Sequence, residues 1–253
     1  MSKKSGNKVA RKKADTKSES RISTLDLLRG IAVILMVQQH TGYWFWESGG
    51  SMGTLLDRYP VMVTANGLGG LAAPVFICLA GIGATLGYGA GRSDRQVFLR
   101  GIVVIALGYM LNILTPAWFA PWSWYVLHLI GFGLCISPLF RRASSPFLIT
   151  LFFLIVLATP ALLTAFNMPR YFSNTFMRGS FSAAAISMLP LCGGNFPIFP
   201  WAGLFAAGLV SGRWILQGTY MNLLKLSAAL IVTGLLLLMV KQGHFKLLDN
   251  MFG

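Results

Sequence analysis

The sequence predicts an all-α, polytopic transmembrane helix bundle of about seven spans with a cytoplasmic N-terminus. Of the 253 residues, 55% are hydrophobic and only 11% are charged, which is too little polar surface for a soluble globule of this size. Apolar runs of about 20 residues, the length of a membrane-crossing helix, recur along the chain. Arginine and lysine gather in every second connection, which orients the spans.

Residues 1–21 form a basic arm ahead of the first span. The chain has a net charge of +14, and much of it lies in this arm, at Lys3, Lys4, Lys8, Arg11, Lys12, Lys13, Lys17 and Arg21. The arm lacks aromatic residues and periodicity, so we expect a disordered cytoplasmic segment that fixes topology and contacts anionic lipid. Because the charge is placed beside the membrane, we expect no nucleic-acid partner. Residues 22–253 are predicted to form one transmembrane domain.

Seven apolar windows are long enough to span a bilayer. They cover residues 25–44, 68–88, 97–114, 124–140, 147–163, 199–216 and 223–240. The second, fourth and sixth connections carry Arg92, Arg95, Arg100, Arg141, Arg142, Arg213 and Lys225. Together with the basic arm, these connections define one positive side, which we assign to the cytoplasm.

Glycine is frequent in several windows, above all in the second, which is followed by Gly89 and Gly91. Small residues at close helical spacing let helices approach one another in lipid, so we predict close helix contacts. No GxxxxGK motif is present, which argues against a nucleotide-binding loop. Cys78, Cys135 and Cys192 lie far apart without metal-ligand spacing, so we expect core residues and no metal site.

The first window contains three ionisable residues, Asp26, Arg29 and His40. Each is unfavourable by several kcal/mol at membrane depth unless it is paired or faces a polar cavity. At about 100° per residue all three fall on one stripe of the helix, with His40 about 21 Å beyond Asp26. The stripe predicts a shared polar cavity. A simple ion pair between Asp26 and Arg29 at the helix entrance is an equally good interpretation of those two residues.

His40 and His128 are the candidate catalytic residues. Both lie near the outer ends of their windows, the first and the fourth. A neutral imidazole can deprotonate an alcohol or amine near pH 7, or carry an acyl group itself. The simpler alternative is that each histidine caps a helix end and meets headgroups or water. Glu47 or Asp57 could orient the ring of His40.

The cytoplasmic end offers a candidate donor-binding site. Arg92, Arg95 and Arg100 join Asp26 and Arg29 there, and arginine suits a phosphate-bearing donor such as coenzyme A. Contact with the phosphates of inner-leaflet lipids is the alternative explanation for these arginines.

Four strings occur in order along the chain: RISTLDLLRGIAVILMVQQH, APVFICLAGIGATLGYG, WYVLHLIGFGLCISPLF and FPIFPWAGLFAAGLVSGR. Together they resemble the heparan-α-glucosaminide N-acetyltransferase-like family, as a bacterial-type member. They resemble, more distantly, the wider membrane acyltransferases that begin with an LD-x-LRG helix ending in histidine. The resemblance implies an acyltransferase domain over residues 22–253 in a bacterial inner (plasma) membrane. It implies transfer of an acetyl (acyl) group from cytoplasmic acetyl-CoA to a cell-envelope glycan or glycolipid acceptor on the outer side.

Individual positions follow from that resemblance. Asp26 and Arg29 match the first-helix motif, His40 matches the histidine of the bacterial-type pattern, and His128 matches the polar residue of the fourth-span motif. One departure concerns the animal enzyme, whose active histidine lies in the loop after the first helix. Residues 43–57 contain no histidine here. Either His40 takes that role, or the chemistry differs.

Two other functions compete with the enzyme. A small-solute or lipid transporter could use Asp26, Arg29 and His40 to line its path, although the chain shows no obvious inverted repeat and no paired broken helices. A noncatalytic scaffold that recruits partners through the basic arm would leave the buried ionisable stripe unexplained. Membrane lipids are partners in every case, and the sequence leaves open whether the chain forms a homo-oligomer.

Overall fold

The computed structural model describes residues 24–42, 57–166, 188–193 and 195–242, which are helical apart from short connections and contain no strand. The chain divides into two compact units, Met1–Leu79 and Ala80–Gly253, with the division inside one helix. The predicted basic arm and Glu47 lie outside the described residues. The predicted all-α, polytopic bundle is confirmed, since long apolar helices account for the described chain.

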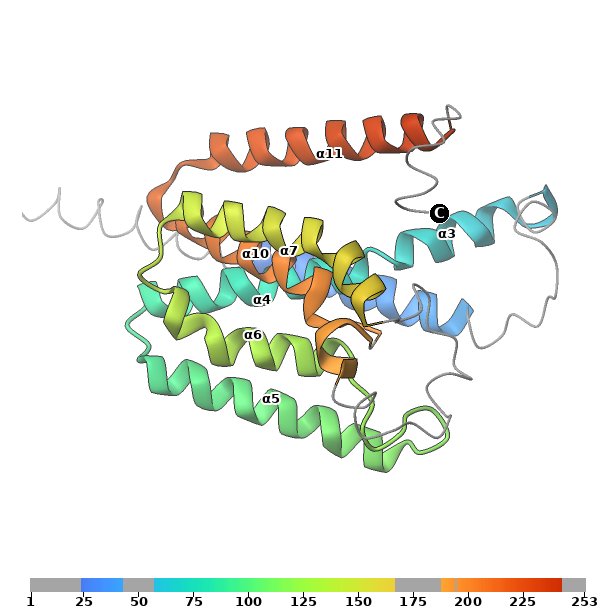
Figure 1. The fold of residues 1–253 in the computed structure, drawn as a ribbon, viewed down its shortest axis with the longest axis horizontal. Coiled ribbons are helices and arrows are strands. Elements are labelled where there is room, and N and C mark those ends of the chain that lie inside the picture. Colours follow the sequence, from blue (N-terminus) through green and yellow to red (C-terminus); the bar gives the residue numbers. More distant parts are fainter. Residues whose placement is uncertain (1–23, 43–56, 167–187, 194, 243–253) are drawn as a thin grey trace, which may run out of the picture. The chain divides into compact units, whose positions relative to one another are not determined.

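A helix covers most of each predicted window (Figure 1). In chain order the helices are residues 24–42, α3 (Pro60–Gly69), α4 (Ala72–Gly89), α5 (Asp94–Leu114), α6 (Val126–Phe140), α7 (Ser145–Ala165), α10 (Ile198–Gln217) and α11 (Tyr220–Gln242), with a short π-helical turn η1 (Leu189–Gly193) before α10. Among the described residues, four runs are long and apolar enough to cross a membrane: Pro60–Gly89, Asp94–Leu114, Ser145–Ala165 and Ile198–Gln217. Helix α6 is apolar but shorter.

The start of the second window was predicted wrongly. The glycines at positions 67, 69 and 70 favour a start near Leu68, yet α3 begins at Pro60 and contains Gly67 and Gly69. Proline is well suited to the first turn of a helix because its missing N–H has no intrahelical partner there. The true interruption lies at Gly70–Leu71, between α3 and α4.

Local signals in the sequence set several helix ends in the second unit. The Ser93 hydroxyl accepts a hydrogen bond from the backbone N–H of Gln96, whose side chain accepts one from the Ser93 N–H, which forms a capping box at the start of α5. The Ser144 hydroxyl caps α7 by accepting from the Phe147 N–H. Helix α10 ends at Gly218, whose φ of 72° is the left-handed conformation that glycine adopts without strain.

Glycines hold the helices of the second unit together, as predicted. Helices α5 and α6 lie side by side (Figure 1) because Gly101 and Gly131 meet there, and a Cβ on Gly101 would lie 2.7 Å from the Gly131 carbonyl oxygen. The ring of Phe205 on α10 covers Gly133 of α6. Bare backbones therefore replace side chains at these contacts, as is common in lipid.

The basic connections of the second unit meet at one end of it. Arg141, just after α6, pairs with Asp94 at the start of α5, and Arg213 near the end of α10 reaches the turn between α6 and α7. The connection from α5 to α6 lies at the opposite end (Figure 1). This alternation agrees with the predicted segregation of positive charge to one side.

Candidate active site

The helix of residues 24–42 carries the predicted polar stripe in the first unit. The Arg29 guanidinium donates to the Asp26 carboxylate at 2.5 Å, and both side chains are about half exposed. This ion pair is one of the two interpretations that the sequence allowed for Asp26 and Arg29. His40 lies 11 residues beyond Arg29, or about 16 Å along the axis. The structure thus brings Asp26 and Arg29 together and places His40 at the other end of the same helix.

The ring of His40 is oriented by the backbone of its own helix. Its Nδ1 lies 2.8 Å from the carbonyl oxygen of Met36. A carbonyl only accepts hydrogen bonds, so the proton of the neutral ring belongs on Nδ1 and a lone pair remains on Nε2. In this tautomer Nε2 is the ring nitrogen that can take a proton or attack a carbonyl carbon.

Helix α3 packs closely against the end of the helix that holds His40. A Cβ on Gly69 would lie 2.5 Å from the Cβ of Gln39, and one on Gly42 would lie 3.0 Å from Oδ1 of Asn66. That Asn66 oxygen is buried and has no hydrogen-bond partner among the described residues. Asn66 was not predicted as a site residue, although an amide side chain inside an otherwise apolar segment is visible in the sequence.

The predicted donor-binding arginines of the second unit lie at its basic end. Arg92, Arg95 and Arg100 are all exposed. The side chain of Arg92 folds back onto α4, where its Cδ would be 3.1 Å from a Cβ on Gly87. All three arginines belong to the α4–α5 connection or the first two turns of α5.

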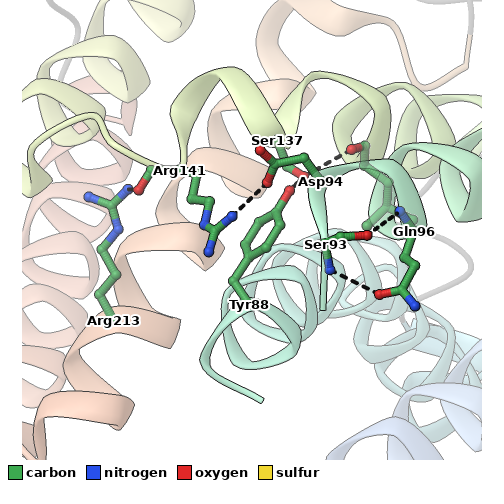
Figure 2. A network of polar contacts seen from close by, with 8 residues as sticks. Tyr88, Ser93, Asp94, Gln96, Ser137, Arg141 and Arg213 are labelled. Atoms are coloured by element: carbon green, nitrogen blue, oxygen red, sulfur yellow. Dashed lines mark hydrogen bonds and ion pairs between the residues drawn. The ribbon is translucent and has the colours of Figure 1, made fainter. Parts of the chain in front are cut away.

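Two further arginines, which sequence analysis used only for orientation, take part in the polar network shown in Figure 2. Arg141 donates to Asp94 at 2.9 Å, and its guanidinium lies 4.9 Å from the centre of the Tyr88 ring. The Tyr88 hydroxyl lies 2.9 Å from the Ser137 hydroxyl. Arg213 donates to the carbonyl oxygens of Phe140, at 2.7 Å, and Ala143. The network joins the ends of α4, α5, α6 and α10.

His128 lies at the opposite end of the second unit and is fully buried. It is surrounded by aromatic rings, with centroid distances of 4.3 Å to Tyr109, 5.4 Å to Trp124 and 4.6 Å to Tyr125. Its Nδ1 accepts a hydrogen bond of 3.3 Å from the Tyr125 N–H. The neutral ring therefore carries its proton on Nε2, the reverse of His40.

A family model described as heparan-alpha-glucosaminide N-acetyltransferase, catalytic, matches residues 21–242. The chain belongs to this family. The match runs from the Asp26–Arg29 pair to α11 and includes every described element. No curated protein and no solved structure matches the chain.

Membership in the N-acetyltransferase family confirms the predicted resemblance. It makes the chain an integral membrane protein of an acetyltransferase family, in agreement with its apolar helices. It also favours the enzyme over the scaffold and the transporter, because the matched family is defined by catalysis.

The structure separates the predicted site residues of the second unit. Arg141 follows His128 by 13 positions, so the aromatic surroundings of His128 and the arginine network are about 20 Å apart along α6. Among the described residues, no cluster of three or more histidine, cysteine or acidic side chains could hold a metal.

Proposed function

We propose that this family member transfers an acetyl (acyl) group from cytoplasmic acyl-CoA to a glycan or glycolipid acceptor on the outer side of a bacterial inner membrane. The observation that supports this most directly is the orientation of His40. Its Nδ1 faces the Met36 carbonyl, so its Nε2 lone pair is the reactive one. His40 ends the helix that also carries the Asp26–Arg29 pair of the first-helix motif.

Two routes use the same nitrogen of His40. As a base, Nε2 takes the proton of the acceptor hydroxyl or amine while that atom attacks the thioester carbonyl and coenzyme A leaves as its thiolate. As an acyl carrier, Nε2 attacks the thioester itself and coenzyme A leaves as its thiolate; the acceptor then displaces the imidazole from the acyl carbon and gives its proton to the released Nε2. In both routes the ring becomes positively charged, and the Nδ1–H bond to Met36 stabilises that charge.

Exposed arginines at the basic end support a site for the phosphates of coenzyme A. Arg92, Arg95 and Arg100 are accessible, whereas Arg141 and Arg213 are engaged in hydrogen bonds that tie the helices together. Guanidinium groups bind phosphate oxygens in a bidentate manner, which suits them to this donor. We assign donor binding to the first three arginines.

The acceptor is a sugar in this proposal. The family's description names an α-glucosaminide, and a hexosamine of a cell-envelope glycan or glycolipid has the same amino and hydroxyl groups. His128 assists as a hydrogen-bond donor, because its Nδ1 is occupied as an acceptor of the Tyr125 N–H.

Acyl transfer by purified protein in lipid nanodiscs tests the proposal. With radiolabelled acetyl-CoA and an envelope-glycan extract, His40→Ala should lower label transfer at least about 100-fold. Thr41→Val is the matched control, because the Thr41 hydroxyl only donates to Val37 of the same helix, at 2.8 Å, and it should keep activity. Arg95→Gln should raise the acetyl-CoA concentration needed for half-maximal rate.

Three results would contradict parts of this assignment. Transfer that persists in His40→Ala but stops in His128→Ala would move the chemistry to α6. An unchanged acetyl-CoA requirement in Arg95→Gln would remove that arginine from the donor site. Wild-type protein that neither binds acetyl-CoA nor releases free coenzyme A would exclude acyl transfer and make transport the leading function.

A further inference from the structure

Two buried polar side chains between α5 and the start of α6 each retain one atom without a hydrogen-bond partner among the described residues. Asn112 is 1% exposed and His128 is 0% exposed. The unpartnered atoms are Oδ1 of Asn112 and Nε2 of His128. Leaving such a group unsatisfied costs about 1–3 kcal/mol, so an interior that holds two of them at one place requires an explanation.

The chemical identity of both atoms follows from their neighbours. The amide nitrogen of Asn112 faces two carbonyl oxygens, those of Pro121 at 3.2 Å and Ser123 at 2.9 Å, so the NH₂ group must point there and Oδ1 remains as an acceptor. The ring of His128 accepts from the Tyr125 N–H through Nδ1, so Nε2–H remains as a donor. One donor and one acceptor are left.

The two atoms belong to the same stretch of the α5–α6 contact. Gly108 and Asn112 are four residues apart on α5 and therefore share a face, about 6 Å from each other. A Cβ on Gly108 would lie 2.9 Å from His128 Nε2, so the Nε2 edge of the ring sits over that glycine. The Tyr125 hydroxyl donates to the Gly108 carbonyl at 2.8 Å and holds the glycine in place. A side chain at position 108 would collide with the imidazole at Nε2, so the ring needs a glycine there.

A hydroxyl group fits this pair, because its oxygen accepts from an N–H while its own proton goes to a carbonyl oxygen. The rings of Tyr109, Trp124 and Tyr125 contact the His128 ring and offer few competing polar groups. The pair lies at the end of the second unit opposite the arginine network. We propose that His128 Nε2–H and Asn112 Oδ1 bind one ring hydroxyl of a hexosaminide acceptor, an assignment that rests on the proposed function and deepens it.

The tautomer of His128 is the first test, and it needs no activity. In protein labelled with ¹⁵N-histidine, the three histidines are assigned with His40→Gln and His244→Gln variants. The proposal expects the proton of His128 on Nε2, and a shift of that nitrogen when methyl α-glucosaminide is added. A proton on Nδ1, or no response to the glucosaminide, would overturn it.

Kinetics with methyl α-glucosaminide form the second test. Asn112→Leu and His128→Phe should each raise KM for the glucosaminide about tenfold while the KM for acetyl-CoA stays within about twofold. His128→Gln, which keeps an N–H donor, should restore part of the loss. Thr159→Val is the matched control, because Thr159 is also buried but its hydroxyl donates only to Ile155 of its own helix. Equal changes in KM for the glucosaminide and for acetyl-CoA, or no change in either KM, would contradict the proposed site.

Deoxy analogues separate a sugar hydroxyl from an internal water, which has the same hydrogen-bonding groups. One of the 3-, 4- and 6-deoxy glucosaminides lacks the hydroxyl that the site binds. For that analogue, KM should be the same in wild type, Asn112→Leu and His128→Phe. If every analogue distinguishes wild type from both variants, the site holds an internal water only and the proposal fails.

Failure of this assignment differs from failure of the proposed function. Wild-type protein that releases coenzyme A but does not acetylate methyl α-glucosaminide would overturn the hydroxyl site and leave acyl transfer intact. Absence of coenzyme A release would overturn acyl transfer, while the ¹⁵N response of His128 to the glucosaminide would still report on the site.

Discussion

Two histidines with the same predicted role are held in opposite tautomers by their backbone partners. His40 points Nδ1 at a carbonyl oxygen, and His128 points Nδ1 at an amide N–H. The residue type and the helix end were visible in the sequence, but these partners depend on ring orientation, which periodicity does not determine. Both candidates could therefore be predicted from the sequence, but the ring nitrogen that carries the proton could not.

Arg213 is expected to stabilise the second unit. It donates to the carbonyl oxygens of Phe140, the last residue of α6, and of Ala143 in the turn that follows. Arg213→Ala should lower the free energy of unfolding by about 2 kcal/mol, as expected for lost hydrogen bonds to a charged group. Thermal unfolding in detergent, followed by tryptophan fluorescence, measures this.

Arg142→Ala is the control for that prediction, because Arg142 is an exposed arginine in the same turn. It should leave Tm nearly unchanged, and Arg213→Lys should recover part of the loss. A similar Tm for Arg213→Ala and Arg142→Ala would show that Arg213 does not fasten α10 to this turn.

At the level of the helices, the sequence predicted which helices form better than it predicted where they begin and end. A membrane span requires a long apolar run, so most of the predicted windows coincide with helices to within a few residues. The exception was α3, because the glycines at 67, 69 and 70 suggest a beginning and the helix passes through the first two of them. The arginine network was not predicted: Arg141 and Arg213 were used only to orient the spans, and the Arg141–Asp94 pair joins residues 47 positions apart.

The contact between α5 and α6 depends on Gly101. A Cβ there would lie 2.6 Å from the sulfur of Cys135 and 2.7 Å from the carbonyl oxygen of Gly131, and backbone cannot move aside as a flexible side chain can. Gly101→Ala should destabilise the protein by about 1–3 kcal/mol. Equilibrium unfolding in mixed micelles tests this.

Gly67→Ala provides the comparison, because nothing lies within 4 Å of a Cβ on that helical glycine. It should be neutral or stabilise by up to about 1 kcal/mol, since alanine restricts the unfolded chain. Equal stability of the two variants would mean that α5 and α6 are not closely packed at Gly101.

For the whole molecule, we predict which side of the membrane each connection between helices faces. The exposed turn residue Ser144 lies at the basic end of the second unit, and exposed Ala117 lies in the α5–α6 connection at the other end. In a protein whose Cys78, Cys135 and Cys192 are replaced, a cysteine at 117 should react with an impermeant maleimide in intact spheroplasts. A cysteine at 144 should react only after permeabilisation.

The opposite labelling pattern would place the basic connections outside and remove the cytoplasmic donor from the proposed function. Labelling of both positions in intact spheroplasts would contradict the assignment of the α5–α6 hairpin as a pair of membrane spans. Wild-type protein labelled in detergent serves as the control for reactivity of the reagent.

The interruption between α3 and α4 has a consequence for depth in the bilayer. Pro60–Gly89 is a 30-residue run, about 45 Å long as a helix, whereas the hydrocarbon layer is about 30 Å thick. Even a tilt of about 40° would leave a hydrophobic mismatch of several ångströms. Helix α4 alone, at 18 residues or about 27 Å, matches the layer. The interruption at Gly70–Leu71 therefore allows α4 to cross the hydrocarbon by itself, without the ten residues of α3.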